Sequence, residues 1–214
     1  MTDYFPLVAG KKYVYRYSSS EFDGCAEVSV VVLSEKTEDG VQTATVRMTT
    51  ALKGHETATV YNIVRDASGV TTYDGIVVGG RKEFPLPVKE GAEWDEYPDA
   101  NEIVSVTDKL RLGETRYEGC LKVLTLIAGG EAGTATRYYA PDVGYVHEVY
   151  HAEDLQAEVS LLRVEQASPL DMELKRTANV AGPDDMGVEG EMEDVVSQEI
   201  KIPRARKGKP KSCK

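Results

Sequence analysis

The residues with the most direct chemical potential are two histidines, His147 and His151, with Glu148 beside the first. On a helix, positions i and i+4 share a face, so both imidazoles could bind one Zn²⁺ while the glutamate activates water. On a strand, the two histidines would lie roughly 13 Å apart, and Glu148 would point to the other face. Pro141, Gly144 and the Val- and Tyr-rich segment that follows favour a strand. The sequence predicts surface histidines, with a zinc-dependent hydrolase as the alternative.

Aromatic side chains form a second candidate group. Tyrosines at every second position of one run would share a face of a strand. On the concave side of a curved sheet they would form an apolar groove for a ligand. They serve equally well in cross-strand packing, which the sequence favours. The candidate ligand-binding residues are Tyr13, Tyr15, Tyr17, Trp94 and Tyr139.

An acidic cluster near the single tryptophan gives a third candidate. Asp95, Glu96 and Asp99 lie close to Trp94 and would suit a cation or a sugar, although a solvated turn explains them as well. The glycine-rich segment 129–133 lies between two strand-like runs and is typical of a hairpin loop. Sequence signatures of a nucleophile elbow, a P-loop or a dinucleotide site are missing. We therefore expect no catalytic residues, no metal and no cofactor.

Composition limits the class of partner. The chain has 214 residues and a formal net charge of −11, so phosphate-rich nucleic acid is not expected as a partner of the main domain. Apolar runs are too short for a membrane helix, so no transmembrane segment is expected. The first residues show no signal peptide, which suits a cytoplasmic protein or a chain whose signal was removed. Cys25, Cys120 and Cys213 are expected as free thiols, with a Cys25–Cys120 bridge as the alternative.

The hydrophobic pattern alternates with period two over most of the chain. The runs predicted as strands cover residues 13–17, 26–33, 43–50, 57–64, 70–73, 102–107, 121–127, 135–139, 145–150 and 157–164. Short strands at this spacing predict a mainly β fold: a curved antiparallel meander sheet, either a half-barrel or an open barrel. We place this domain at residues 3–165. Residues 166–214 follow as a short helix near 169–177 and a flexible tail, acidic over 182–199 and basic over 200–214.

A weak internal echo links two parts of the chain. Tyr4-Phe5-Pro6-Leu7, then Gly10 and Tyr13, parallels Glu83-Phe84-Pro85-Leu86, then Gly91 and Trp94. In each copy a Phe-Pro-Leu edge leads through a glycine to an aromatic residue that opens a strand. The echo predicts that one sheet has two halves with similar beginnings.

Three short motifs carry a resemblance to a known family. They are the opening at Tyr4–Tyr13, Gly119-Cys120-Leu121-Lys122-Val123, and Tyr138-Tyr139-Ala140-Pro141-Asp142-Val143-Gly144. Together they resemble a family of exported bacterial β-rich proteins of unknown function. In layout the chain is similar to half-barrel envelope proteins that include lipoprotein carriers.

The resemblance implies a curved antiparallel sheet, a periplasmic or extracellular location and no catalytic residues. It also implies a strand after Gly144. The function expected from the sequence is a non-catalytic envelope protein. Its concave face would bind an apolar small molecule, a lipid or a protein partner. A purely structural or interaction module is the further alternative.

Overall fold

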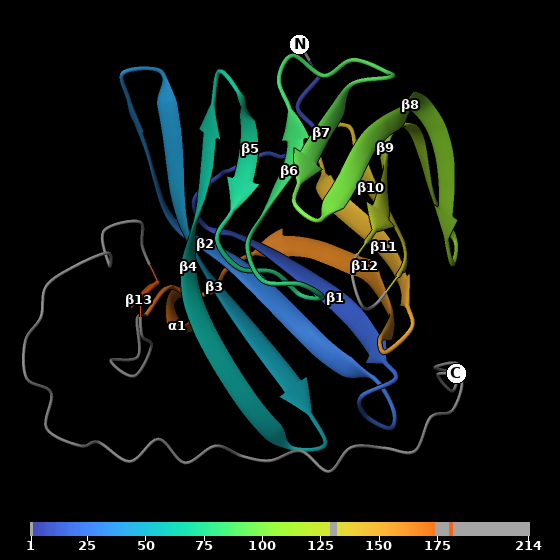
Figure 1. Cartoon of the computed structure of the whole chain (residues 1–214). Coiled ribbons are helices and arrows are strands. Elements are labelled where there is room, and N and C mark those ends of the chain that lie inside the picture. The colour runs from blue at the N-terminus through green and yellow to red at the C-terminus, as the bar shows by residue number, and fades with distance from the viewer. Residues whose placement is uncertain (1, 129–131, 174–179, 182–214) are drawn as a thin grey trace, which may run out of the picture.

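The computed structural model describes residues 2–128, 132–173 and 180–181, and most of them lie in the strands of one largely antiparallel sheet (Figure 1). The first half of the sheet comprises β1 (Lys11–Ser19), β2 (Ala26–Glu38), β3 (Val41–Leu52), β4 (His55–Asp66), β5 (Gly69–Thr72) and β6 (Arg81–Pro85). The second half comprises β7 (Glu93–Glu96), β8 (Asp99–Leu112), β9 (Thr115–Ile127), β10 (Gly133–Ala140), β11 (Gly144–Ala152) and β12 (Gln156–Gln166).

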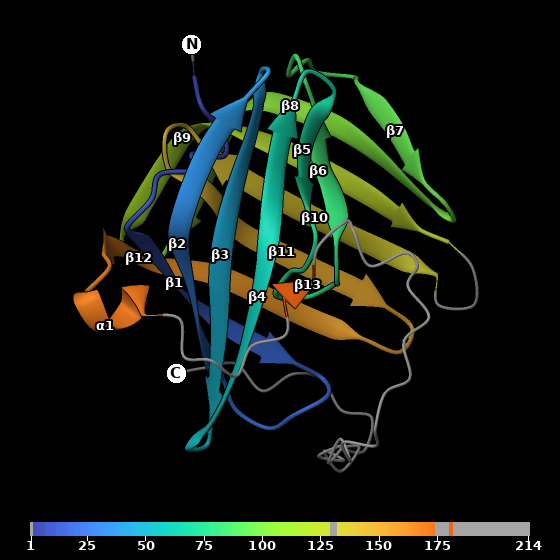
Figure 2. The same cartoon turned by 90° about the vertical axis from the view of Figure 1, so that its left-hand side faces the viewer.

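Each half is a meander, and the halves join where β1 pairs with β12, Tyr13 lying opposite Val164. The sheet order β6-β5-β4-β3-β2-β1-β12-β11-β10-β9-β8-β7 leaves β6 and β7 as the two edges. The sheet curls into a barrel with a single unsealed seam between these edges. In Figure 2, β2, β3 and β4 cross in front of β9–β12, which form the opposite wall. The expected open antiparallel meander barrel is confirmed.

The seam is bridged by a side chain. The Lys82 amide of β6 donates a hydrogen bond to Oε1 of Glu96 on β7 at 2.6 Å. The predicted period-two runs correspond to ten strands of the barrel, whereas β6 and β7 were not among them. The two copies of the internal echo lead into β1 and β7, but Glu83-Phe84-Pro85 of the second copy lies within β6, so the two half-sheets do not have matching beginnings.

The N-terminal segment before β1 crosses one end of the barrel. Arg65 of β4 forms an ion pair with Asp3 at 2.6 Å. The Tyr4 hydroxyl donates to the Gly119 carbonyl of β9 at 3.1 Å, and Asp142 N donates to the Asp3 carbonyl at 2.7 Å. The segment therefore links both walls and places Phe5, together with the residues that follow it, beside the lumen.

Two short elements follow β12. Ser168 caps the four-residue helix α1 (Pro169–Met172): its hydroxyl accepts a hydrogen bond from Asp171 N. The two-residue strand β13 (Val180–Ala181) pairs in parallel with β4. The acidic and basic tail segments, 182–199 and 200–214, lie outside the described residues.

The structure tests the predicted state of two cysteines, Cys25 and Cys120. Cys120 is a free thiol, 0% exposed, so the alternative Cys25–Cys120 bridge is wrong. Burial raises the pKa of the Cys120 thiol to about 11. Cys25 is disulfide-bonded, so the expected free thiol is wrong at that position.

Candidate functional site

A group of buried charged residues crosses the lumen and joins β6 to β10 and β11. Arg81 of β6 contacts Glu148 of β11 through two hydrogen bonds, at 2.9 and 2.7 Å. Arg81 Nε also lies 3.1 Å from Glu83 Oε1. Glu83 in turn forms an ion pair with Arg137 of β10 at 3.2 Å. Two positive and two negative side chains thus form a neutral group, which we call the ion-pair bridge.

Local strand geometry explains why these four side chains meet. Arg81 and Glu83 are two positions apart on β6, so both point inward, as do Arg137 and Tyr139 on β10. On β11 the register shifts: Tyr138 lies opposite His147, and Tyr139 lies opposite Tyr145. The extra residue, Val146, turns both Tyr145 and Glu148 inward although they are three positions apart.

Neighbouring hydroxyls complete the bridge. The Tyr145 hydroxyl donates to Glu148 Oε2 at 2.7 Å, and the Thr72 hydroxyl donates to Glu83 Oε1 at 3.0 Å. The Tyr139 hydroxyl also donates to Glu83. Burial by itself raises the pKa of Glu83, but the Arg81 and Arg137 charges outweigh it and hold that pKa below its usual value. The Glu83 carboxylate is therefore ionised at neutral pH.

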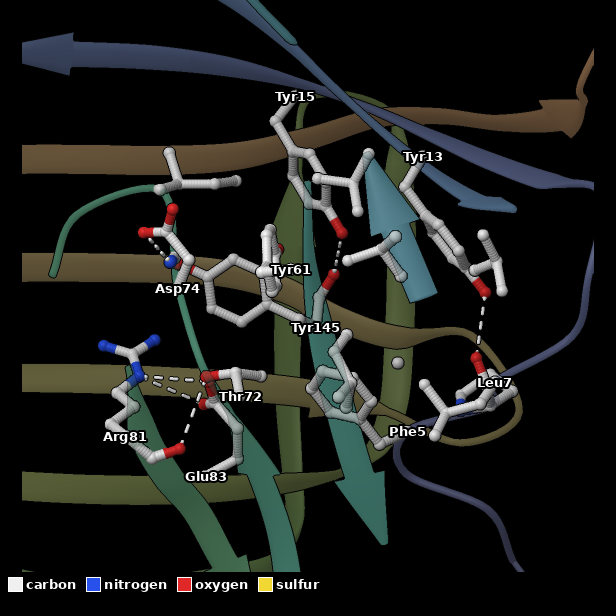
Figure 3. Close-up of a pocket in the computed structure, with 18 of the residues that line it drawn as sticks. Phe5, Leu7, Tyr13, Tyr15, Tyr61, Thr72, Asp74, Arg81, Glu83 and Tyr145 are labelled. Atoms are coloured by element: carbon white, nitrogen blue, oxygen red, sulfur yellow. Dashed lines mark hydrogen bonds and ion pairs between the residues drawn. The ribbon is translucent and has the colours of Figure 1, made fainter. Parts of the chain in front are cut away.

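An apolar chamber lies on one side of the bridge (Figure 3). Its volume is about 70 Å³, and its lining combines aromatic and aliphatic residues of the first half-sheet with Phe5. The Tyr13 hydroxyl donates to the Pro6 carbonyl at 3.3 Å, and that of Tyr15 donates to the Tyr145 carbonyl at 3.1 Å. With their hydroxyls engaged by main-chain oxygens, the tyrosines present ring surfaces to the chamber.

A second, polar chamber lies at the seam and has a volume of about 520 Å³. Arg81 lines both chambers, Glu83 lines the apolar chamber, and Arg137 lines the polar one. The ion-pair bridge therefore lies between the two.

The structure separates the candidate ligand-binding residues. Tyr13 and Tyr15 line the apolar chamber. Tyr139 is fully buried behind it, with ring centroids 5.1 Å from Phe84 and 5.8 Å from Tyr145.

Like Tyr139, the candidates Tyr17 and Trp94 lie outside both chamber linings. Tyr17 packs edge-on against Phe22 at 5.4 Å. Trp94 lies on β7, and its indole N–H is buried without a hydrogen-bond partner among the described residues. The aromatic residues therefore do not act as one group.

The histidine motif lies on β11, as its strand-like context predicted. His147 is 8% exposed, however, so the expected surface position is wrong for this residue, whereas His151 is exposed. The His147 Nδ1–H donates to the Val159 carbonyl at 2.7 Å, and burial lowers the pKa of the imidazole. Within the described part of the chain, no three His, Cys, Asp or Glu side chains are grouped to hold a metal ion.

Sequence reasoning missed the ion-pair bridge. The available signal was Arg137, a charged side chain on the same strand face as Ala135 and Tyr139. On a strand whose inward face is otherwise apolar, such a residue must find a buried counter-ion. Its counter-ion Glu83 is 54 residues away in sequence, so the pattern did not identify it.

Comparison with known proteins shows a shared fold. No protein-family model and no curated protein matches the chain. A solved structure from Bacteroides fragilis NCTC 9343, of a protein described as exported and as having a YmcC-like fold, matches with a TM-score of 0.51 at 14% identity. The match covers 78% of this chain and 100% of that chain.

A second solved structure, of a protein from Parabacteroides distasonis ATCC 8503 described as a lipoprotein, matches with a TM-score of 0.51 at 12% identity. It covers 77% of this chain and 99% of that chain. No helix in the described residues has the length and hydropathy needed to cross a membrane. At these identities the likeness is one of fold: the chain shares the open antiparallel barrel of these two bacterial proteins.

Proposed function

We propose that this chain is a non-catalytic envelope protein that binds an apolar group in the apolar chamber of its barrel. The observation that carries the proposal is the lining of that chamber. Tyr13, Tyr15 and Phe5 present ring surface beside Val46 and Ile63, and the tyrosine hydroxyls are held by main-chain carbonyls. Such a surface gains free energy when an apolar group displaces water from it.

The size of the apolar chamber limits what enters it. A volume of about 70 Å³ exceeds the roughly 10–15 Å³ that one water needs and is far below the roughly 300–1,000 Å³ of a site that encloses a drug-sized ligand. The chamber therefore suits the end of an apolar chain rather than a whole lipid. That chain end belongs to a lipid-like small molecule or is an apolar side chain of a protein partner.

The proposal has two further parts: an envelope location of the protein and a non-catalytic role. Envelope placement is supported by the fold shared with two proteins described as exported and as a lipoprotein. A non-catalytic role is supported by the state of the charged lumen residues. Glu83 and Glu148 are each held in ion pairs, so neither is available as a proton acceptor without breaking the bridge.

The apolar chamber can be tested with 1-decanol as a lipid-like probe. We expect decanol to shift the ¹³C-methyl NMR signals of Val46 and Ile63, and Val46→Phe to abolish the shift at Ile63 by filling the chamber. Val41→Phe is the matched control, because Val41 lies on the same strand but is 38% exposed. Methyl signals that decanol leaves unchanged would reject a lipid-like molecule as the ligand. If Val41→Phe also abolished the shift at Ile63, the chamber would be rejected as the binding site.

A separate measurement tests the alternative that the protein is a zinc-dependent hydrolase. We expect the purified protein to carry no stoichiometric zinc that depends on His147, measured by elemental analysis of wild type and His147→Ala. Stoichiometric zinc that disappears in this variant would overturn the non-catalytic proposal.

A further inference from the structure

The polar chamber has the size and position of a binding site. Its volume of about 520 Å³ falls within the range of roughly 300–1,000 Å³ that is usual for small-molecule sites. It is lined by the start of β6, the turn between β7 and β8, and the adjoining parts of β8, β9, β10 and β11. It thus lies where the sheet is not closed.

The polar base of this chamber is rigid. Asn101, Thr125 and Arg137 are 4%, 8% and 1% exposed. The Thr125 hydroxyl donates to Asn101 Oδ1 at 2.7 Å, and Arg137 donates to the same oxygen at 2.8 Å and to Thr125 at 3.0 Å. Three side chains from three strands are thus fixed before any ligand arrives, which lowers the entropic cost of binding.

Two carboxylates form the rim. Glu96 Oε1 accepts one hydrogen bond from the Lys82 amide, and Asp99 Oδ1 accepts one from the Ala128 amide at 3.0 Å. An ionised carboxylate has about four acceptor positions, so both retain acceptor capacity toward a ligand. These are two of the three acidic residues that the sequence grouped near Trp94. The third, Asp95, is exposed and does not line the chamber.

One wall of the polar chamber is apolar. Ile127, Ala135 and the ring of Tyr150 line it; Ile127 and Ala135 belong to a small cluster apart from the main core, and Tyr150 packs against both. A ligand in the chamber would therefore contact hydrocarbon on one side and hydrogen-bonding groups on the other.

Charge decides which ligand fits. Arg81 and Arg137 are neutralised by Glu148 and Glu83 within the bridge, but their positive ends still face the chamber base, whereas Glu96 and Asp99 at the rim are negative. An anion would be repelled at the rim and a cation at the base. A hydroxyl both donates and accepts, so it satisfies the rim and the base together.

We propose that the polar chamber binds a small, neutral, polyhydroxylated molecule, which is the chemistry of a sugar. Its C–H face lies on the Ile127–Ala135–Tyr150 wall, and its hydroxyls face Asn101 and the two rim carboxylates. This site is separate from the apolar chamber, from which the ion-pair bridge divides it.

The probes are D-glucose, N-acetylglucosamine, maltose and cellobiose, observed by saturation-transfer NMR and by amide shifts of Asn101 and Thr125. We expect at least one of the four to bind and to shift those amides. Ala135→Leu fills the chamber and should weaken binding by at least about tenfold. Thr134→Leu is the matched control: it lies one position earlier on β10, is exposed, and should leave binding unchanged.

A second chamber-filling variant keeps the proposal testable if Ala135→Leu does not fold. Gly79 lines the polar chamber, and a Cβ at this position meets no atom within 4 Å, so Gly79→Leu begins its side chain in open space. It should weaken sugar binding while the 1-decanol response of Val46 stays unchanged.

Three results would overturn the proposal. They are no response to any of the four sugars, binding that survives both chamber-filling variants, and preferential binding of choline or inorganic phosphate.

Discussion

Arg81 and Glu148 join the free edge of the sheet to the opposite wall of the barrel through two parallel hydrogen bonds of 2.9 and 2.7 Å. The Glu148 side chain is 0% exposed and that of Arg81 is 15% exposed. β6 pairs with β5 on one side and has no strand partner among the described residues on the other, so this contact holds an edge that the described sheet leaves unpaired.

Removing one partner of this pair should be costly. We expect Arg81→Met to lower the free energy of unfolding by about 3–5 kcal/mol, because Glu148 would remain buried without its main counter-ion. Urea denaturation measures the change. In the double variant Arg81→Met/Glu148→Leu the loss should be smaller than the sum of the single losses. Lys36→Met removes an exposed ion pair and should change stability by at most about 0.5 kcal/mol. If Arg81→Met lowered the free energy of unfolding no more than Lys36→Met does, this account would be contradicted.

The hydroxyl of Tyr145 should contribute measurably to stability. Tyr145→Phe removes the hydrogen bond to Glu148 Oε2, and we expect a loss of about 1–3 kcal/mol in denaturant unfolding. Tyr97→Phe is the control for removal of the same atom, because Tyr97 is 98% exposed and should show no loss. If Tyr145→Phe were neutral, the inward turn produced at Val146 would have no energetic role.

His147 should make stability depend on pH below neutrality. Burial lowers the pKa of His147 in the folded protein, so protonation favours the unfolded chain, where the pKa is about 6.5. Its contribution is complete above the unfolded value and is lost as pH falls from there toward the folded value. We expect unfolding free energies measured at pH 7.5 and 5.5 to differ less in His147→Asn than in wild type. His151→Asn, at the exposed histidine, should behave as wild type.

The seam should show local opening that one carboxylate controls. Glu96→Ala removes the acceptor for the Lys82 amide, so hydrogen exchange at that amide should become faster. Glu93→Ala, on the same strand but exposed, is the control and should not change the rate. Equal exchange in wild type and Glu96→Ala would mean that the seam is protected by other contacts.

The alternation of residue types predicted the barrel well, because most strands have one face in the core. Tyr13, Tyr15 and Tyr17 were correctly placed together, and all three are buried. β6 escaped detection because its buried residues are the charged Glu83 and the adjacent Phe84, and a register shift against β5 interrupts the period-two alternation. The same charges that hid this strand make it part of the ion-pair bridge.

The burial of His147 could not be derived from the sequence either, because it depends on contacts with a neighbouring strand. Period two placed His147 and Glu148 on opposite faces, and the structure agrees. Which face is buried depends on neighbouring strands, and on β11 both are: Glu148 is 0% exposed and His147 is 8% exposed. The contact of His147 with Val159 comes from β12, which a local pattern does not identify.

The pairing of β1 with β12 has a kinetic consequence. Every other neighbouring pair in the barrel is also consecutive in sequence, so each forms by closing a comparatively short loop. Among the described strands β1 to β12, the pairing of β1 with β12, in which Tyr13 lies opposite Val164, is the one strand pairing that joins parts of the chain far apart in sequence. We therefore expect two independently growing meanders and one slow annealing event between them. The transition state for folding would then centre on the strand pair opposite the seam.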